Sequence, residues 1–273
     1  MNIKRILKLS RPRFWLYTLG PFLIGTAAGG NMNSIFRFEI WYGFLYFLLP
    51  ANLFIYGVND YFDRHIDNIN PKKHKQEAYM RLKDARSSML LAAISVLLCL
   101  PLLFINLQVS LALLTFIFVG FFYSSPPIRF KTKIVFDSFS NFFYIIPGII
   151  GYLLIAGTMP PVNMFIAGSL WAIAMHLFSA IVDIEPDKKA GIRTSATALG
   201  YKKSLILTSL LWFSAATLVL PYSQLLLIGY MYAFLPLLVL FKKITVSRIY
   251  WIFPWINAVL GFLLFWIVLI TRL

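Results

Sequence analysis

The 273-residue sequence is poor in acidic residues, in charge of either sign and in cysteine. Ten Asp and Glu residues stand against 25 Lys and Arg residues, which gives a formal net charge of +15. Charged residues make up 13% of the chain, about half of their usual share in soluble proteins. This composition excludes an ordinary soluble domain. The single cysteine, Cys99, excludes an intramolecular disulfide, and its apolar surroundings favour a structural role.

Long apolar runs take the place of charge. Hydrophobic residues make up 60% of the chain, and the mean hydropathy is +0.77. We predict an all-α polytopic membrane protein with nine transmembrane helices in one bundle and a central cavity opening to the cytoplasmic side. The apolar runs do not alternate, which argues against a barrel. The predicted spans lie near 14–30, 38–58, 88–105, 108–124, 138–156, 163–182, 204–220, 222–241 and 250–270.

The basic residues orient this bundle. All Lys and Arg residues except Arg37 and Arg272 fall in segments 1–13, 59–87, 125–137, 183–203 and 242–249. Since cytoplasmic loops are rich in Lys and Arg, we expect a cytoplasmic N-terminus, an outer C-terminus and a prokaryotic plasma membrane. The positive charge then suits anionic lipid better than nucleic acid. Segment 1–13 has no cleavage site after it, so we expect a lead-in to the first span and not a signal peptide.

The scarce acids gather in two clusters at the predicted cytoplasmic ends of apolar segments. Asn59, Asp63 and Asp67 recur every four residues, as do Asp183 and Asp187, so each set would lie on one helix face. Carboxylates at a membrane edge are costly unless a positive charge neutralises them. Two such oxygen-rich faces suit hard divalent cations that hold a phosphate. The alternative is that each cluster is only a solvated helix end.

The two clusters resemble the aspartate-rich motifs of the UbiA superfamily of intramembrane prenyltransferases. Predicted span count, orientation and motif order are similar over essentially the whole chain. The resemblance implies that two Mg²⁺ ions bridge the diphosphate of an isoprenoid donor. Asp60 belongs to the first motif as well, although it is rotated by about 100° from Asn59 on a helix. The implied metal ligands are Asn59, Asp60, Asp63, Asp67, Asp183 and Asp187.

Diphosphate becomes a good leaving group only when its charge is neutralised, for which Lys and Arg side chains are suited. The string from Tyr123 to Lys131 is similar to a family loop whose lysine contacts diphosphate, and the string from Ser10 to Trp15 resembles the start of the family's first span. For each basic residue the alternative is anchoring at the membrane surface. The candidates for contact with diphosphate are Arg13, Arg64, Lys131, Lys188 and Arg193, and Arg11 lies in the same string as Arg13.

A histidine within a predicted span is the remaining candidate for chemistry. His176 lies seven residues, or two helical turns, before Asp183. It could accept a proton after carbon–carbon bond formation or orient the acceptor; alternatively it is a neutral imidazole between helices. The 26 Phe, 14 Tyr and seven Trp residues could enclose an allylic carbocation, although no single ring stands out. The predicted catalytic residues are Asp63, Lys131, His176 and Asp183.

No motif indicates a zinc site, a Ser-His-Asp triad or a glycine-rich nucleotide loop. Gly148, Gly151 and Gly168 are more typical of close helix packing. We expect one membrane-embedded prenyltransferase domain over residues 1–273. Its pseudo-repeat halves would span roughly 1–124 and 125–241, followed by a final helix at 250–270.

The acceptor is the open part of the prediction. Strings around the motifs, such as 137–141 and 179–187, resemble the lycopene elongase branch of the superfamily. That resemblance implies transfer of a dimethylallyl unit to lycopene or a related carotenoid from the bilayer. One alternative is an aromatic acceptor in quinone, chlorophyll or haem biosynthesis. A distant alternative is a cation-coupled transporter, whose acids would be expected nearer the membrane midplane.

Overall fold

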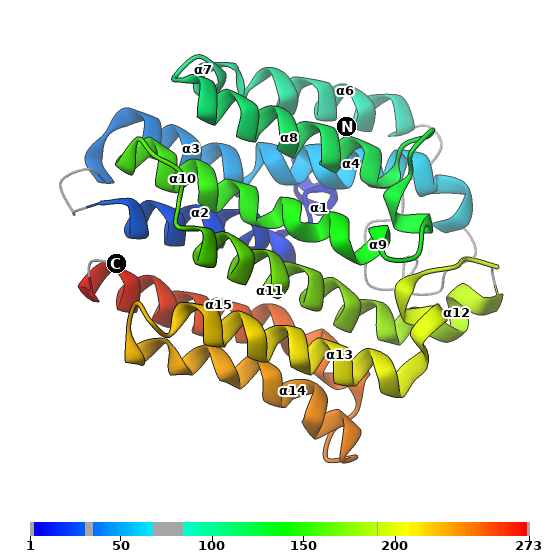
Figure 1. The fold of residues 1–273 in the computed structure, drawn as a ribbon. Helices are drawn as coiled ribbons and strands as arrows, with labels where there is room; N and C mark the ends of the chain where they lie inside the picture. The colour runs from blue at the N-terminus through cyan, green and yellow to red at the C-terminus, as the bar shows by residue number, and fades with distance from the viewer. Residues whose placement is uncertain (1–2, 31–34, 68–83, 190, 272–273) are drawn as a thin grey trace.

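A computed structural model describes residues 3–30, 35–67, 84–189 and 191–271, with the side chains of residues 65–67 left out. Every regular element in these ranges is helical, and the helices run side by side as one bundle (Figure 1). The all-α prediction is confirmed. Seven segments are long and apolar enough to cross a membrane: Phe38–Arg64, Ala85–Leu103, Leu107–Ser124, Phe136–Ala156, Val162–Lys189, Ser195–Val219 and Val246–Thr271.

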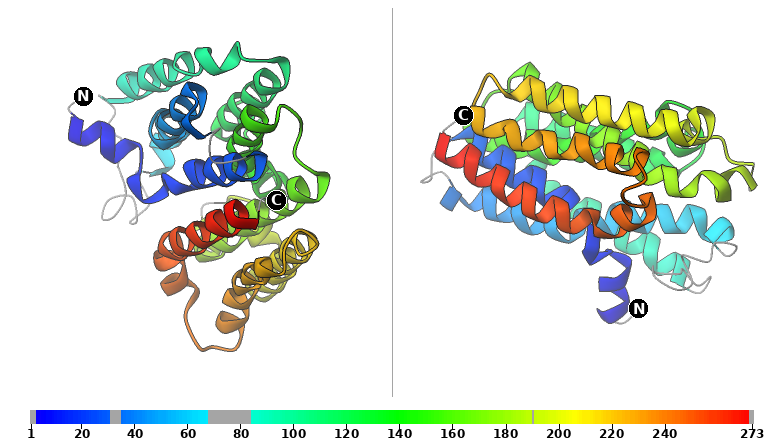
Figure 2. Two further views of the ribbon diagram at one scale, coloured as in Figure 1. Left: turned by 90° about the vertical axis from the view of Figure 1, so that its left-hand side faces the viewer. Right: turned by 90° about the horizontal axis from the view of Figure 1, so that it is seen from below.

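Two of the nine predicted spans are shorter. Helix α2 (Leu16–Gly29) has 14 residues, and the apolar segment Gln224–Leu240 contains the 3₁₀ helix η7 (Gln224–Gly229) and α14 (Tyr230–Leu240). Both lie within the bundle beside longer helices (Figure 2). The structure therefore confirms seven predicted spans by length, whereas the membrane crossing of α2 and α14 stays a prediction.

The first part of the chain forms helices α1 (Ile3–Leu9), α3 (Phe38–Leu48), α4 (Pro50–Asp67), α6 (Ala85–Leu97), α7 (Leu100–Leu103) and α8 (Leu107–Ser124). A break separates α3 from α4 because Pro50 has no N–H to continue the ladder of α3. Buried Asn52 closes this break: its Nδ2 donates to the carbonyl of Phe47 at 3.1 Å and to Thr18 Oγ1 of α2 at 2.8 Å. The amide thus holds α2, α3 and α4 together.

The second part contains more breaks than its hydropathy predicts. The fifth predicted span consists of α9 (Phe136–Phe139), the 3₁₀ helix η5 (Ser140–Ile145) and α10 (Ile146–Ala156). The sixth consists of α11 (Val162–Ala180), the 3₁₀ helix η6 (Ile181–Asp183) and α12 (Ile184–Lys189). Helix α13 (Ser195–Val219) is kinked at Gly200, where φ is 75°, and α15 (Val246–Thr271) ends the described chain.

Glycines let α2 approach α10 closely. A Cβ built on Gly25 would lie 1.9 Å from the carbonyl oxygen of Gly148, and one built on Gly151 would lie 2.4 Å from that of Phe22. A Cβ on Gly168 would lie 3.2 Å from Ile145 Cγ2. The prediction that Gly148, Gly151 and Gly168 serve helix packing is confirmed. This contact fixes α2, which borders both cavities described below, against α10, which borders one of them.

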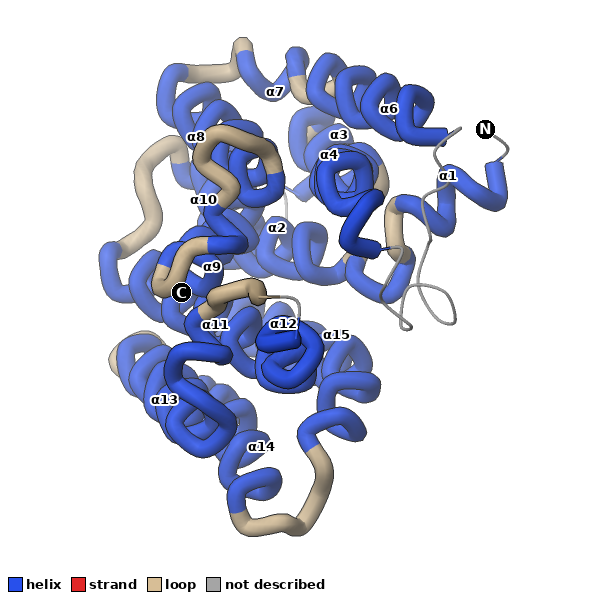
Figure 3. The backbone as a smooth tube through the Cα atoms, turned by 90° about the vertical axis from the view of Figure 1, so that its right-hand side faces the viewer, coloured by secondary structure: helices blue, strands red, loops and turns tan. Residues whose placement is uncertain are grey.

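Both acidic clusters lie at the same end of the bundle. The ends of α4 and α12 are close to α9 at the right of Figure 1, the end that faces the viewer in Figure 3. Helix α7 and the last turn of α15 lie at the opposite end. The fold therefore brings the two acidic motifs, which are far apart in the sequence, to the same end of the bundle.

Candidate active site

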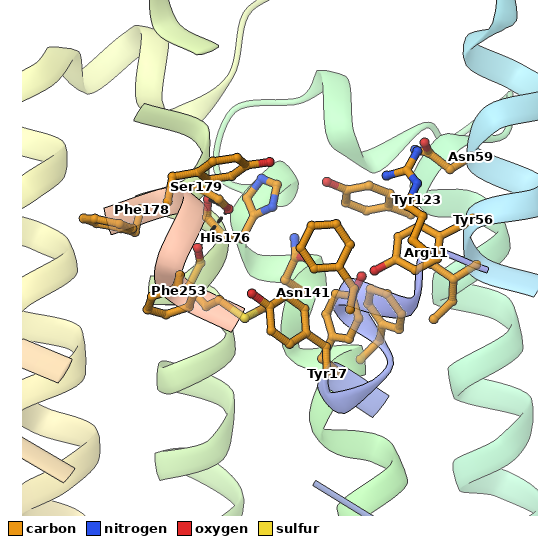
Figure 4. A pocket seen from close by; sticks show the side chains of 16 residues that line it. Arg11, Tyr17, Tyr56, Asn59, Tyr123, Asn141, His176, Phe178, Ser179 and Phe253 are labelled. Carbon is orange, nitrogen blue, oxygen red and sulfur yellow. Dashed lines mark hydrogen bonds between the residues drawn. The ribbon is translucent and has the colours of Figure 1, made fainter. Parts of the chain in front are cut away.

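A cavity of about 210 Å³ lies between α2, α4, α8, α11 and α15, and we call it the polar cavity. Its polar lining residues include Arg11, Asn59, Tyr123, Asn141 and His176. Figure 4 shows His176 on one side of this space, with Tyr123, Asn59 and Arg11 on the other. The remaining wall is mainly aromatic: Phe14, Tyr17, Tyr56, Phe143, Tyr144, Phe178, Tyr250 and Phe253.

The first acidic motif leads from this cavity to the bundle end. Asn59 lines the cavity, and its Nδ2 donates to Ser124 Oγ, at the end of α8, at 2.9 Å. Asp63 lies one turn further along α4. Its carboxylate forms ion pairs with Lys131 and, at 3.2 Å, with Arg129. Both cations come from the loop after α8. The sequence resemblance had singled out Lys131, and the structure places it against a motif carboxylate.

Asp60 faces a different partner. Its Oδ1 accepts a hydrogen bond from Arg11 Nη2 at 2.5 Å, and the side chain is fully buried. The guanidinium of Arg11 also lies 4.6 Å from the centre of the Tyr56 ring. A buried carboxylate needs such a cation, and this pair fixes Arg11 in the cavity wall. Asp60 is rotated away from Asn59 on α4, and it therefore contacts Arg11 and not the partners of Asn59 or Asp63.

Four other predicted diphosphate contacts lie elsewhere. Arg13 Nη2 donates to the carbonyls of Tyr250 and Trp251 at 2.8 and 3.0 Å, which ties the N-terminal segment to α15. Arg64 folds back onto the Tyr61 carbonyl at 2.6 Å. Lys188 lies 3.7 Å from exposed Glu185, and Arg193 is exposed. None of these four side chains lines the polar cavity as the described residues form it.

His176 reaches the cavity beside a buried carboxylate. Its Nε2 lies 3.9 Å from Asp137 Oδ2, and its ring meets the Tyr123 ring edge-on at 6.1 Å. Asp137 is held by Ser195, whose backbone N–H and hydroxyl donate to it at 2.9 and 2.5 Å. Asn141 also fixes this turn through its bond to the Asp137 carbonyl at 2.6 Å. Asp137 is therefore a fixed carboxylate close to the imidazole of His176.

The second acidic motif does not form one regular helix face. Asp183 ends η6, whereas Asp187 lies in α12. Ser179, four residues before Asp183, lines the polar cavity together with His176, so this motif begins next to the cavity. Among described side chains, no three His, Cys, Asp or Glu residues form a metal cluster. Asp67 falls outside that set, since only its backbone, at the end of α4, is described.

A second cavity lies deeper in the bundle, and we call it the inner cavity. It has a volume of about 290 Å³ and lies among α2, α10, α11, α13, η7 and α15. Tyr17 lines both cavities. The described residues around the inner cavity include no charged side chain, and nearly all are aliphatic or aromatic. The site as a whole therefore passes from a charged end through an aromatic chamber to an apolar interior.

Several residues of this site were not predicted individually. Arg129, Tyr123, Asn141 and Asp137 lay in strings that carried the family resemblance, but nothing in the sequence pointed to their contacts. Ser195 follows the acidic motif after a loop and carried no signal. The i, i+4 spacing of Asp137 and Asn141 is the one pattern that indicated a shared helical face.

Several known proteins are similar to this chain over most of its length. A lycopene elongase/hydratase of Haloferax volcanii is 43% identical over 94% of this chain and 85% of its own length. One of Halobacterium salinarum is 40% identical over 93% and 92%. The solved structure of an Archaeoglobus fulgidus UbiA homolog, bound to DMAPP and Mg²⁺, matches the fold with a TM-score of 0.70, covering 96% of this chain and 99% of its own at 21% identity.

A family model also matches most of the chain. Residues 18–252 match the model of the UbiA prenyltransferase family, a range that includes both acidic motifs, the loop after α8 and His176. The chain belongs to the UbiA prenyltransferase family.

Proposed function

We propose that this protein transfers a dimethylallyl group from its diphosphate to lycopene or a related carotenoid in a Mg²⁺-dependent reaction. The observation that carries the proposal is the continuity of the site. A charged end with Asp63, Arg129 and Lys131 adjoins an aromatic chamber and then an apolar cavity. The identity of 40% or more to lycopene elongase/hydratases over most of both chains supports this acceptor.

The charged end would hold the diphosphate. Carboxylate and amide oxygens are the ligands that Mg²⁺ prefers, so the donor set of the two motifs fits this ion. Asn59, Asp63 and Asp67 on one side and Asp183 and Asp187 on the other would hold two ions. When bound, Mg²⁺ neutralises the diphosphate and improves it as a leaving group.

The chain's own cations complete this charged end. Arg129 and Lys131 form ion pairs with Asp63 and would contact diphosphate oxygens. Asp60 serves in this scheme to position Arg11, which it binds directly. Arg13, Arg64, Lys188 and Arg193 stay predicted contacts from the sequence, to which the distances add no support.

The aromatic chamber would protect the allylic cation. Loss of diphosphate leaves a positive charge on the prenyl group, which an aromatic face stabilises and water would destroy. The Phe143 and Tyr144 rings lie 4.2 Å apart at the chamber wall, and the Tyr17 ring meets the Tyr144 ring edge-on. These rings line the cavity next to Arg11 and Asn59, which places them beside the proposed diphosphate.

His176 would take the proton at the end of the reaction. Attack by the terminal alkene of the acceptor forms the new carbon–carbon bond and leaves a tertiary cation. A neutral imidazole in the cavity wall can remove a proton from it, and Asp137 stabilises the imidazolium that results. Asp137 acts here as a positioning residue.

The inner cavity favours a hydrocarbon acceptor. A phenol or aromatic acid acceptor, as in quinone biosynthesis, would need charged or polar groups to hold it. The described lining of the inner cavity has no charged side chain. A polyene gains its binding energy from apolar contact alone, at about 25 cal/mol per Å² buried. We therefore prefer the carotenoid to the aromatic acceptor.

The membrane arrangement belongs to the same proposal. We infer nine spans in a single domain, with a cytoplasmic N-terminus and an outer C-terminus in a prokaryotic plasma membrane. The position of both acidic motifs at one bundle end supports a polar cavity open to the cytoplasm. The two pseudo-repeat halves and the final helix stay part of this proposal.

Expression in a lycopene-producing host tests the acceptor. We expect carotenoids one or two C5 units longer than lycopene, and their absence would reject the carotenoid acceptor. The Asp63→Asn and Asp183→Asn variants should abolish these products. Glu185→Gln is the matched control, since the Glu185 side chain is 75% exposed between the two aspartates of the second motif. Equal activity in all variants would reject the diphosphate site.

A further inference from the structure

Asn257 is an exception in the inner cavity. It lies on α15 and is the one amide side chain among the described residues that line this cavity. Only 8% of the residue is exposed. Neither Nδ2 nor Oδ1 has a hydrogen-bond partner within the described chain. The cavity thus contains an amide with a free donor and a free acceptor in otherwise apolar surroundings.

A buried amide is unfavourable unless its donor and acceptor have hydrogen-bond partners. Buried polar side chains almost always have a hydrogen-bond partner, because an unsatisfied one loses its hydration without compensation. Two polar groups of α13 have such partners: Trp212 Nε1 donates to the Trp171 carbonyl at 3.2 Å, and Ser209 Oγ donates to the Ala233 carbonyl at 2.8 Å. The hydroxyls of Ser204 and Thr208 have no partner within the described chain, but neither residue lines the inner cavity. Asn257 does line it, so a molecule in the cavity can supply its partner.

The position of Asn257 relates it to the reaction. Phe253 lines the polar cavity, and Asn257 follows it by four residues on the same face of α15. One helical turn is about 5–6 Å, so the amide lies about one turn deeper than the aromatic chamber. This is the depth at which the part of the acceptor next to the new bond would lie.

We propose that Asn257 binds a neutral O–H group inside the apolar cavity. The inference rests on the proposed function. A hydroxyl donates and accepts at once, which matches the Oδ1 and Nδ2 of one amide. The uncharged lining disfavours carboxylate and ammonium groups. Two sources share this chemistry: a water molecule, and an alcohol already present at one end of the polyene.

If the bound O–H group is water, Asn257 influences which product the reaction forms. The water oxygen donates a lone pair to the tertiary carbon that carbon–carbon bond formation has left positive. The oxygen of the new C–O bond then loses one proton to a base. The product is a tertiary alcohol, and no oxidation or reduction takes place. With an alcohol source, Asn257 instead selects acceptors that are already hydrated.

Asn257→Leu tests the proposal, with Asn257→Ser as the variant that keeps an O–H group. Product analysis with lycopene and dimethylallyl diphosphate gives the hydroxylated fraction. For bound water, the leucine variant should lower that fraction about tenfold. For a bound alcohol, it should raise the KM for mono-hydrated lycopene about tenfold more than the KM for lycopene. The serine variant should retain most of either property.

Thermal unfolding in detergent gives a readout that does not depend on turnover. Mono-hydrated lycopene should raise the Tm of the wild-type protein more than lycopene does, and the two should act equally on the leucine variant. Unchanged products, KM values and ligand shifts in the leucine variant would overturn the inference. Failure of wild-type protein to extend lycopene would instead count against the proposed function.

Discussion

Lys131 and Lys133 lie two residues apart in the loop after α8, yet only Lys131 contacts the acidic motif. Lys131 is bound to Asp63, whereas Lys133 is exposed. We expect Lys131→Met to raise the KM for dimethylallyl diphosphate about tenfold to hundredfold, the effect of losing one charge-assisted contact. Lys133→Met should leave it within about twofold. Steady-state kinetics of both purified variants decide this, and equal effects would contradict the assignment of Lys131.

The pair of His176 and Asp137 gives a different kinetic signature. We expect His176→Gln to lower the rate of product formation about 100-fold with little change in donor KM, as for loss of a general base. Asp137→Asn should act in the same direction but less strongly, because it only positions the imidazole. The ratio of diphosphate released to carotenoid formed should rise in both variants. If that ratio stayed constant, the two residues would have only a structural role.

Individual residues were predictable where spacing on one helix decided their direction. The interval of four residues placed Asn59 and Asp63 on one face of α4, and the 100° rotation separated Asp60 from them. The contact of Asp63 with Arg129 spans 66 positions in the sequence, and that of Ser195 with Asp137 spans 58. Such contacts depend on how helices pack, and no local pattern reports them.

Alanine substitutions at two glycines of α2 are predicted to have opposite effects on stability. A Cβ on Gly25 would clash with the backbone of α10, whereas a Cβ on Gly20 would meet nothing within 4 Å. We expect Gly25→Ala to destabilise the protein by about 1–3 kcal/mol or more through overpacking. Gly20→Ala should stabilise it by about 0.5–1 kcal/mol, because alanine favours the helix. Thermal unfolding of both variants in detergent measures this; a lower Tm only for Gly20→Ala would contradict the packing.

Helices were predictable to within a few residues where one apolar run forms one helix. The span near 108–124 is observed as Leu107–Ser124. Breaks within a run were not predictable, as in α9, η5 and α10 or in α11, η6 and α12. Hydropathy reports burial in lipid, and it does not distinguish an α-helical from a 3₁₀ hydrogen-bond pattern. Asp137, His176 and Asp183 lie at or near these breaks.

The orientation of the whole bundle can be measured by cysteine labelling, because the chain has a single cysteine. Cys99 is buried and free, so a Cys99→Ser background leaves no thiol. A single cysteine at Ser223 should react with a membrane-impermeant maleimide in intact cells, and one at Lys242 should react only after lysis. These two positions flank η7 and α14, at opposite ends of this segment. The reverse pattern would contradict the proposed topology.

At the level of the molecule, the family followed from two short motifs, whereas the acceptor did not. The motifs are proposed to bind the diphosphate, which all members of such a family would share. The acceptor is proposed to bind in an apolar cavity built from elements far apart in the sequence, whose shape no local sequence pattern specifies. Similarity over the full chain to named relatives supplies that part of the proposal.

The central claim is that one site couples Mg²⁺-dependent loss of diphosphate to carbon–carbon bond formation on a carotenoid. Purified protein, dimethylallyl diphosphate and lycopene in micelles test it directly, with diphosphate release and carotenoid mass measured together. We predict one diphosphate released for each C5 unit added, no reaction in EDTA and none with Asp63→Asn. Release of diphosphate without a heavier carotenoid, or an undiminished yield in EDTA, would contradict the account.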